Sequence, residues 1–126
     1  MSNRTRITVG VDIIEIDRIE QAISSWQDSF LQRVYTDAEL EICQNRASSF
    51  AARFAAKEAV MKALTTGMWG LQWREIEITQ NTSGAPKVKL HGKARSKAEE
   101  LGIANFALSL SHSKKYAVAM VVGDAI

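Results

Sequence analysis

One stretch of the chain places two lysines and a glutamate on a helix that is otherwise apolar. Residues 54–62 read FAAKEAVMK, a composition that favours a helix with no Gly or Pro to interrupt it. On a 3.6-residue period, Lys57 falls inside the apolar stripe and Glu58 at its edge, with Lys62 one turn further along. Burying a lysine charge costs several kcal/mol unless an anion meets it. We therefore expect this helix to direct Lys57, Glu58 and Lys62 toward one target, an anion beside a metal ion.

A second acid, Asp12, stands in a run of Val, Ile and Gly near the start of the chain. Taken alone, Asp12 fits the solvent face of a strand equally well. If it lies across a sheet–helix interface from Glu58, two carboxylates about 4 Å apart repel by roughly 4 kcal/mol at an effective dielectric of about 20. A proton or a cation must then lie between them. Two carboxylates suit Mg²⁺, particularly when a phosphate completes its coordination, whereas zinc is disfavoured because the sequence has no Cys/His cluster.

The remaining candidates are basic or hydroxylated side chains. Arg53 lies one turn before Lys57, and solvated ion pairing explains Arg53 as well as ligand binding does, whereas the apolar stripe favours binding for Lys57. Lysines near a metal would neutralise a diphosphate as charge builds on it. Residues 109–114 place serines and His112 at a turn that could bind a phosphate or a ribose edge, although local hydrogen bonding is the default for such a turn alone.

The elements that must position these residues follow from periodicity and turn signals. Alternating, β-branched runs predict strands at 7–14, 75–79, 86–90, 106–111 and 116–122. Apolar periodicity and capping residues predict helices at 18–26 (with Asp17 as N-cap), 30–35, 37–45, 49–64 (with Ser48 or Ser49 as N-cap) and 92–101. Thr36 and Glu39 have the capping-box spacing, and Gly102 would end the last helix in the left-handed conformation. This order predicts an α+β fold, with an antiparallel sheet packed against the long central helix.

Size and composition suit one soluble domain over residues 1–126. The chain has 126 residues, 46% of them hydrophobic, and a formal net charge of +2. The single cysteine, Cys43, excludes an internal disulfide and fits a reducing compartment. With no signal peptide or membrane span in the sequence, we expect a cytoplasmic protein.

Two segments together resemble the signatures of the phosphopantetheinyl transferases. Residues 10–18 read GVDIIEIDR and resemble the first signature, and residues 54–62 resemble the second. The short chain, the segment 36–39, the turn 84–86 and the SLSH sequence at 109–112 resemble the small, single-domain branch of that family. The resemblance implies the family's fold and its homotrimeric assembly, with active sites between subunits.

The resemblance also implies a reaction, in which 4′-phosphopantetheine moves from coenzyme A to a serine of apo-acyl carrier protein. Adenosine 3′,5′-bisphosphate would be released, and the role would be in fatty acid biosynthesis. By likeness to the family, Asp12 and Glu58 hold Mg²⁺ (or Mn²⁺), and Lys62 steadies the leaving phosphate. Glu58, or a water on the metal, takes the serine proton. The residues implied around the nucleotide are Arg53, Lys57, Lys62, Gly67 and His112.

One segment departs from the family pattern, and two other functions stay open. The helix after the first signature is often rich in arginine and docks the acidic carrier protein, but here it carries Arg18 with Glu20 and Asp28, which weakens electrostatic steering. Either Arg18 and Arg33 suffice for docking or the preferred carrier protein differs.

The carboxylate–lysine cluster would also serve a Mg²⁺-dependent nucleotide phosphohydrolase. A nucleic-acid-binding module is disfavoured by the small net charge and the lack of a basic stripe.

Overall fold

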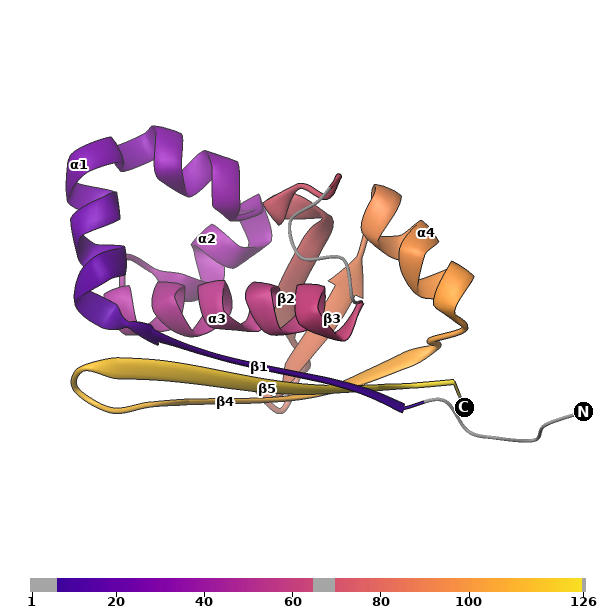
Figure 1. Ribbon diagram of the computed structural model, residues 1–126. Helices are drawn as coiled ribbons and strands as arrows, with labels where there is room; N and C mark the ends of the chain where they lie inside the picture. The colour runs from indigo at the N-terminus through magenta and orange to yellow at the C-terminus, as the bar shows by residue number, and fades with distance from the viewer. Residues whose placement is uncertain (1–6, 65–69, 126) are drawn as a thin grey trace, which may run out of the picture.

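A long helix, α3 (Ala47–Ala63), runs through the middle of the molecule, between a sheet and the other helices (Figure 1). The computed structural model describes residues 7–64 and 70–125, so the predicted site residue Gly67 lies outside the described residues. The strands are β1 (Ile7–Glu15), β2 (Ile76–Gln80), β3 (Pro86–Leu90), β4 (Asn105–His112) and β5 (Tyr116–Asp124). The other helices are α1 (Ile16–Val34), α2 (Asp37–Cys43), α4 (Gly92–Leu101) and the short 3₁₀ helix η1 (Trp73–Glu75). The predicted α+β class is confirmed.

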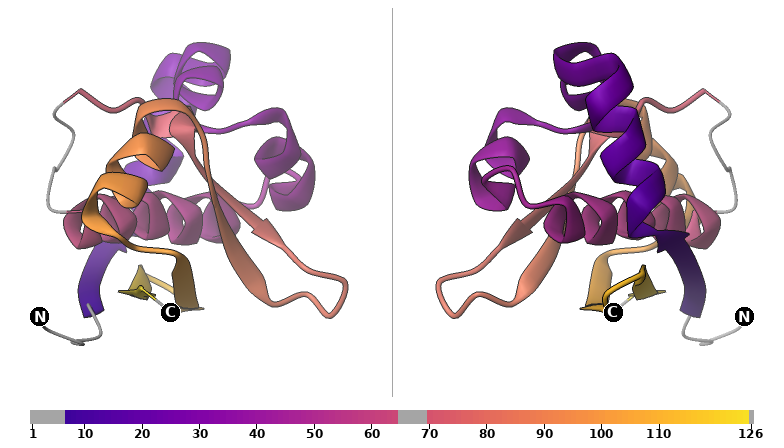
Figure 2. Two further views of the ribbon diagram at one scale, coloured as in Figure 1. Left: turned by 90° about the vertical axis from the view of Figure 1, so that its right-hand side faces the viewer. Right: turned by 90° about the vertical axis from the view of Figure 1, so that its left-hand side faces the viewer.

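The strands form two antiparallel sheets. In the first, the order is β1-β5-β4, and in the second β2 pairs with β3. The three-stranded sheet lies along one side of α3, and the β2–β3 hairpin passes beside α3 and projects to one side of the molecule (Figures 1 and 2). No other described element covers the far face of the three-stranded sheet (Figures 1 and 2). The sheet is therefore packed on one face only within the chain.

Strand β1 has four of its large apolar residues on the uncovered face, while Ile14 packs against the core. Ile7, Val9, Val11 and Ile13 are 55–66% exposed. The alternate residues face α3, because a Cβ added at Gly10 would lie 1.9 Å from the carbonyl oxygen of Ala59. Only glycine permits this close approach of strand and helix backbones. The same alternation places Asp12 on the side of β1 that faces α3.

The helices differ from the predicted ones mainly at their ends. The pieces predicted at 18–26 and 30–35 form one element, α1, with a break at Gln27, whose φ is 48°. The predicted cap at Asp17 is wrong, because α1 begins at Ile16, whose amide donates to the carbonyl of Lys115. The predicted cap of α3 at Ser48 or Ser49 is also wrong. Left-handed residues at 44 and 45 turn the chain directly from α2 into α3, with Arg46 in the N-cap position.

Two local signals are confirmed as predicted. Thr36 and Glu39 form a full capping box at the start of α2. Gly102 ends α4 with a φ of 74°. Apolar side chains form one cluster around the C-terminal half of α3 and a second, containing the fully buried Cys43, around its N-terminal half. Among the described helices, none combines the length and apolar character needed to cross a membrane.

Candidate active site

Asp12, Glu58 and Lys62 meet where β1 lies against α3. Lys62 Nζ is 3.2 Å from Asp12 Oδ1 and donates to the carbonyl of Val11 over 2.9 Å. The side chain of Asp12 is 17% exposed and that of Lys62 is 54% exposed. Asp12 therefore faces the helix, which excludes its alternative placement on the solvent face of a strand. The three side chains form a charged site that solvent reaches from one side.

The electrostatics of this site depend on the closeness of its two acids. Burial, followed by the negative charge of Asp12, raises the pKa of Glu58, while Lys62 opposes the shift. The two carboxylates therefore lie near enough for their charges to repel. The ammonium of Lys62 is the cation that faces them in this structure.

The donors of the site fit a hard divalent cation. Within residues 7–64 and 70–125, no group of three or more His, Cys, Asp or Glu side chains is placed to hold a metal. Asp12 and Glu58 would supply two carboxylates, and the ammonium of Lys62 lies beside Asp12 and partly balances their negative charge. Mg²⁺ commonly binds through one or two carboxylates, with water and substrate phosphates as its other ligands. The residues present therefore fit Mg²⁺.

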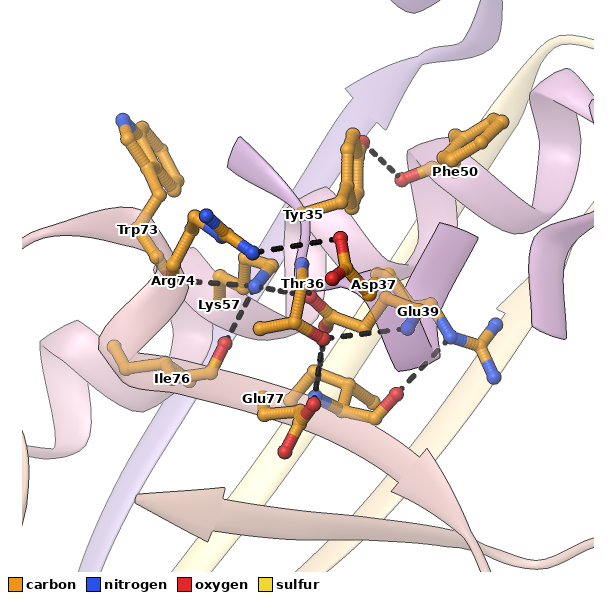
Figure 3. Close-up of polar contacts among 12 residues, drawn as sticks. Tyr35, Thr36, Asp37, Glu39, Phe50, Lys57, Trp73, Arg74, Ile76 and Glu77 are labelled. Atoms are coloured by element: carbon orange, nitrogen blue, oxygen red, sulfur yellow. Dashed lines mark hydrogen bonds and ion pairs between the residues drawn. The ribbon is translucent and has the colours of Figure 1, made fainter. Parts of the chain in front are cut away.

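Lys57 lies in a different environment, and the predicted common target for Lys57, Glu58 and Lys62 is wrong. The Lys57 side chain has no exposed surface and forms an ion pair of 2.7 Å with Glu39 (Figure 3). The side chains of adjacent helix residues point in directions about 100° apart around the helix axis, so Lys57 faces β2 while Glu58 faces β1. Its predicted contact with a nucleotide is corrected for the same reason, since the ammonium is enclosed by protein.

Arg53 and His112, also predicted to contact a nucleotide, form hydrogen bonds with protein groups outside the charged site. Arg53 is 7% exposed, and its Nε donates to the carbonyl of Ile78 on β2 over 3.2 Å. His112 is exposed at the end of β4, with Nδ1 3.4 Å from the carbonyl oxygen of Ser113. These contacts tie Arg53 to β2 and His112 to its own turn. Their roles toward a nucleotide stay predictions.

One residue of this region was missed by sequence reasoning. Glu39 was assigned only to the capping box, yet the same carboxylate is fully buried and pairs with Lys57. The apolar stripe around Lys57 indicated that a buried anion was needed. No local pattern pointed to Glu39, because the two residues are 18 positions apart and meet only when α2 packs beside α3.

The fold and the carboxylate–lysine site define a class of protein. The family model of the 4′-phosphopantetheinyl transferase superfamily matches residues 8–121. The chain belongs to this superfamily of enzymes.

Particular relatives narrow the comparison to one branch. The chain is 50% identical over 124 residues to a holo-[acyl-carrier-protein] synthase of Herpetosiphon aurantiacus, a match covering 93% of this chain and 98% of the relative. It is also 50% identical over 115 residues to that of Dehalococcoides mccartyi strain CBDB1, covering 91% of this chain and 96% of the relative. The crystal structure of the Helicobacter pylori holo-[acyl-carrier-protein] synthase, in complex with coenzyme A, matches with a TM-score of 0.84 and 34% identity. That match covers 91% of this chain and 98% of the other.

Proposed function

We propose that the chain is a holo-acyl-carrier-protein synthase. It transfers 4′-phosphopantetheine from coenzyme A to a serine of apo-acyl carrier protein and releases adenosine 3′,5′-bisphosphate. The observation that carries the proposal is the meeting of Asp12, Glu58 and Lys62 at the β1–α3 contact. The near full-length similarity to synthases of this name, one of them in complex with coenzyme A, supports it. We place the activity in fatty acid biosynthesis and in the cytoplasm.

In this proposal Asp12 and Glu58 hold Mg²⁺, or Mn²⁺, beside the diphosphate of coenzyme A. When bound, the cation neutralises charge on the diphosphate, which is the main requirement of phosphoryl transfer besides alignment. The support is the chemistry of the donor set. Two acids are held near each other, and burial and mutual repulsion raise the pKa of Glu58.

Lys62 and Glu58 have separate tasks in the transfer. Lys62 is half-exposed, and in this proposal its ammonium exchanges Asp12 for the phosphate that becomes the leaving group, where its charge stabilises the departing oxygen. Glu58, or a water on the metal, takes the proton of the hydroxyl of the incoming serine. Neither step needs a covalent intermediate on the protein.

We further propose that the active enzyme is a homotrimer with active sites between subunits. The support is the uncovered apolar face of the three-stranded sheet. Its exposed large residues are Ile7, Val9, Val11, Ile13, Tyr116 and Met120. Val11 pairs with Met120 in the β1–β5 register, so the two strands contribute to one continuous patch. An apolar patch of this kind marks an interface. In the trimer, Arg53, Gly67 and His112 would complete the nucleotide site.

Intact-mass spectrometry tests the proposal. Purified apo-acyl carrier protein is incubated with this protein, coenzyme A and Mg²⁺, and a mass gain of one phosphopantetheine group is expected. Glu58→Gln removes the gain while the far-UV circular dichroism spectrum is retained. Full activity in that variant would refute the assignment of Glu58. Release of inorganic phosphate or AMP without a carrier protein would identify the phosphohydrolase instead.

A further inference from the structure

Helix α3 carries a few large apolar side chains, Phe50, Phe54, Val60 and Met61, but most of its buried residues are alanines. Small residues are spread around the helix, and they are Ala51, Ala52, Ala55, Ala56, Ala59 and Ala63. Helices gain a defined packing geometry from side-chain ridges that fit into grooves, and alanine makes shallow ridges. The rotation of α3 about its axis nevertheless matters, because Glu58 and Lys62 must face Asp12 on β1.

The Lys57 side chain anchors the side of this helix that faces β2. Its ammonium donates to three oxygens, Glu39 Oε1 at 2.7 Å, the carbonyl of Trp73 at 3.1 Å and the carbonyl of Ile76 at 2.5 Å (Figure 3). An ammonium group has three N–H donors, so every donor has a partner. These acceptors come from α2, η1 and β2, three elements beside the helix.

Glu39 is held as firmly as Lys57. Its Oε1 accepts from the amide of Thr36 over 2.9 Å as well as from Lys57, and its Oε2 accepts from the amide of Ile78 over 2.8 Å. Both charged side chains are fully buried. The pair therefore joins α3 to the start of α2 and to strand β2.

Such a pair is not explained by stability alone. Apolar residues of similar volume are often as stabilising as a buried ion pair, or more so, whereas fixing a register is the best-attested use of buried polar groups. Because Glu58 leaves the helix about 100° from Lys57, holding Lys57 against β2 determines the direction in which Glu58 points.

We propose that Glu39 and Lys57 are positioning residues, whose buried ion pair sets the rotation of α3 and so directs Glu58 and Lys62 to Asp12. The inference rests on the proposed function, since it assigns Glu58 and Lys62 to the reaction. Neither Glu39 nor Lys57 touches the substrate. Both act through the helix that carries the reacting groups.

The double variant Glu39→Gln/Lys57→Met tests this role, because it removes both buried charges and keeps side chains of similar size. We expect it to stay folded, with kcat lowered by about tenfold or more through misplacement of Glu58. A second measurement does not depend on turnover. In the presence of coenzyme A, Mn²⁺ affinity, measured from the electron paramagnetic resonance signal of free Mn²⁺, should fall by about tenfold. Glu39→Gln alone, which keeps an acceptor for Lys57, should give a smaller loss of the same kind.

Cys43→Ala is the matched control. Cys43 is fully buried one turn beyond Glu39 on the same helix, so its replacement destabilises α2 while the groups that hydrogen-bond to Glu39 and Lys57 all stay in place. At a temperature where it is folded, the control should keep the wild-type kcat and Mn²⁺ affinity. The proposal is overturned if the double and single variants match the wild type in both measurements, or if the control loses as much as the double variant. If the wild type does not modify apo-acyl carrier protein, the proposed function fails, and the Mn²⁺ comparison still tests the positioning role.

Discussion

Replacing Gly10 with alanine should destabilise the protein more than any ordinary glycine substitution in a strand. The added Cβ would lie 1.9 Å from the Ala59 carbonyl oxygen, 2.8 Å from its carbonyl carbon and 3.1 Å from the Ala63 amide nitrogen. All three are backbone atoms of α3, so no side chain can rotate away. Strand β1 must retreat by about 1.5 Å before the closest contact reaches an ordinary 3.4 Å.

The size of the effect follows from overpacking. Overpacking usually lowers the free energy of unfolding by about 1–3 kcal/mol, and a clash with rigid backbone should lower it by about 3 kcal/mol or more. For a chain of this length, a loss of that size lowers the midpoint of thermal unfolding by about 10 °C. The assay is thermal unfolding followed by circular dichroism, at one protein concentration because association shifts the midpoint.

Gly123→Ala is the control, since Gly123 lies on the neighbouring strand β5. A Cβ there would meet only side-chain atoms, of Thr8 at 2.9 Å, Ile103 at 3.0 Å and Phe106 at 3.1 Å. These neighbours can give way, so the loss should be smaller, on the order of 1 kcal/mol. Equal midpoints for the two variants, or a wild-type midpoint for Gly10→Ala, would refute the close-approach argument.

Three further predictions concern the charged site and the uncovered face. The pKa of Glu58 is raised by folding, so its stabilising contribution is present below the unfolded-state pKa and is lost as the pH rises through the folded-state pKa. Glu58→Gln should therefore unfold at a higher temperature than the wild type at about pH 8. This difference in unfolding temperature should vanish at about pH 4. A difference that grows on acidification would contradict the assignment. Lys62→Ala should lower kcat by about a hundredfold in steady-state kinetics with apo-acyl carrier protein, because a charge facing the diphosphate is lost, and a kcat within twofold would exclude that role. Val11→Glu should yield a monomer in light scattering coupled to size-exclusion chromatography, since it buries a charge in the proposed interface, and an unchanged assembly would show that the sheet face is not the contact.

Local signals explain why so much of the fold was predictable. The capping box at Thr36 and the left-handed Gly102 depend on residues within one turn of each other, and both were found as predicted. The hairpin of β2 and β3 depends on the turn between them in the same way. Helix ends were less predictable because partners distant in sequence cap them, as the Lys115 carbonyl does for Ile16.

The charged site was predictable in part for the same reason. Glu58 and Lys62 are one turn apart, so their common face follows from helical geometry alone. Lys57 was grouped with them because its buried charge demanded an anion, and the sequence offered no way to distinguish a ligand from Glu39. Periodicity assigns a residue to a face of its helix, but it does not say which neighbouring element covers that face.

The buried thiol of Cys43 can report local unfolding of helix α2 through its reaction with a thiol reagent. It is the only cysteine in the sequence, and burial, the largest cause, raises the pKa of its thiol to about 11. A thiol reagent acts on the exposed thiolate, so the folded chain should resist labelling at neutral pH. Each labelled molecule has therefore passed through a locally unfolded state in which α2 separated from α3. The rate of modification would measure local unfolding of this half of the core without any introduced probe.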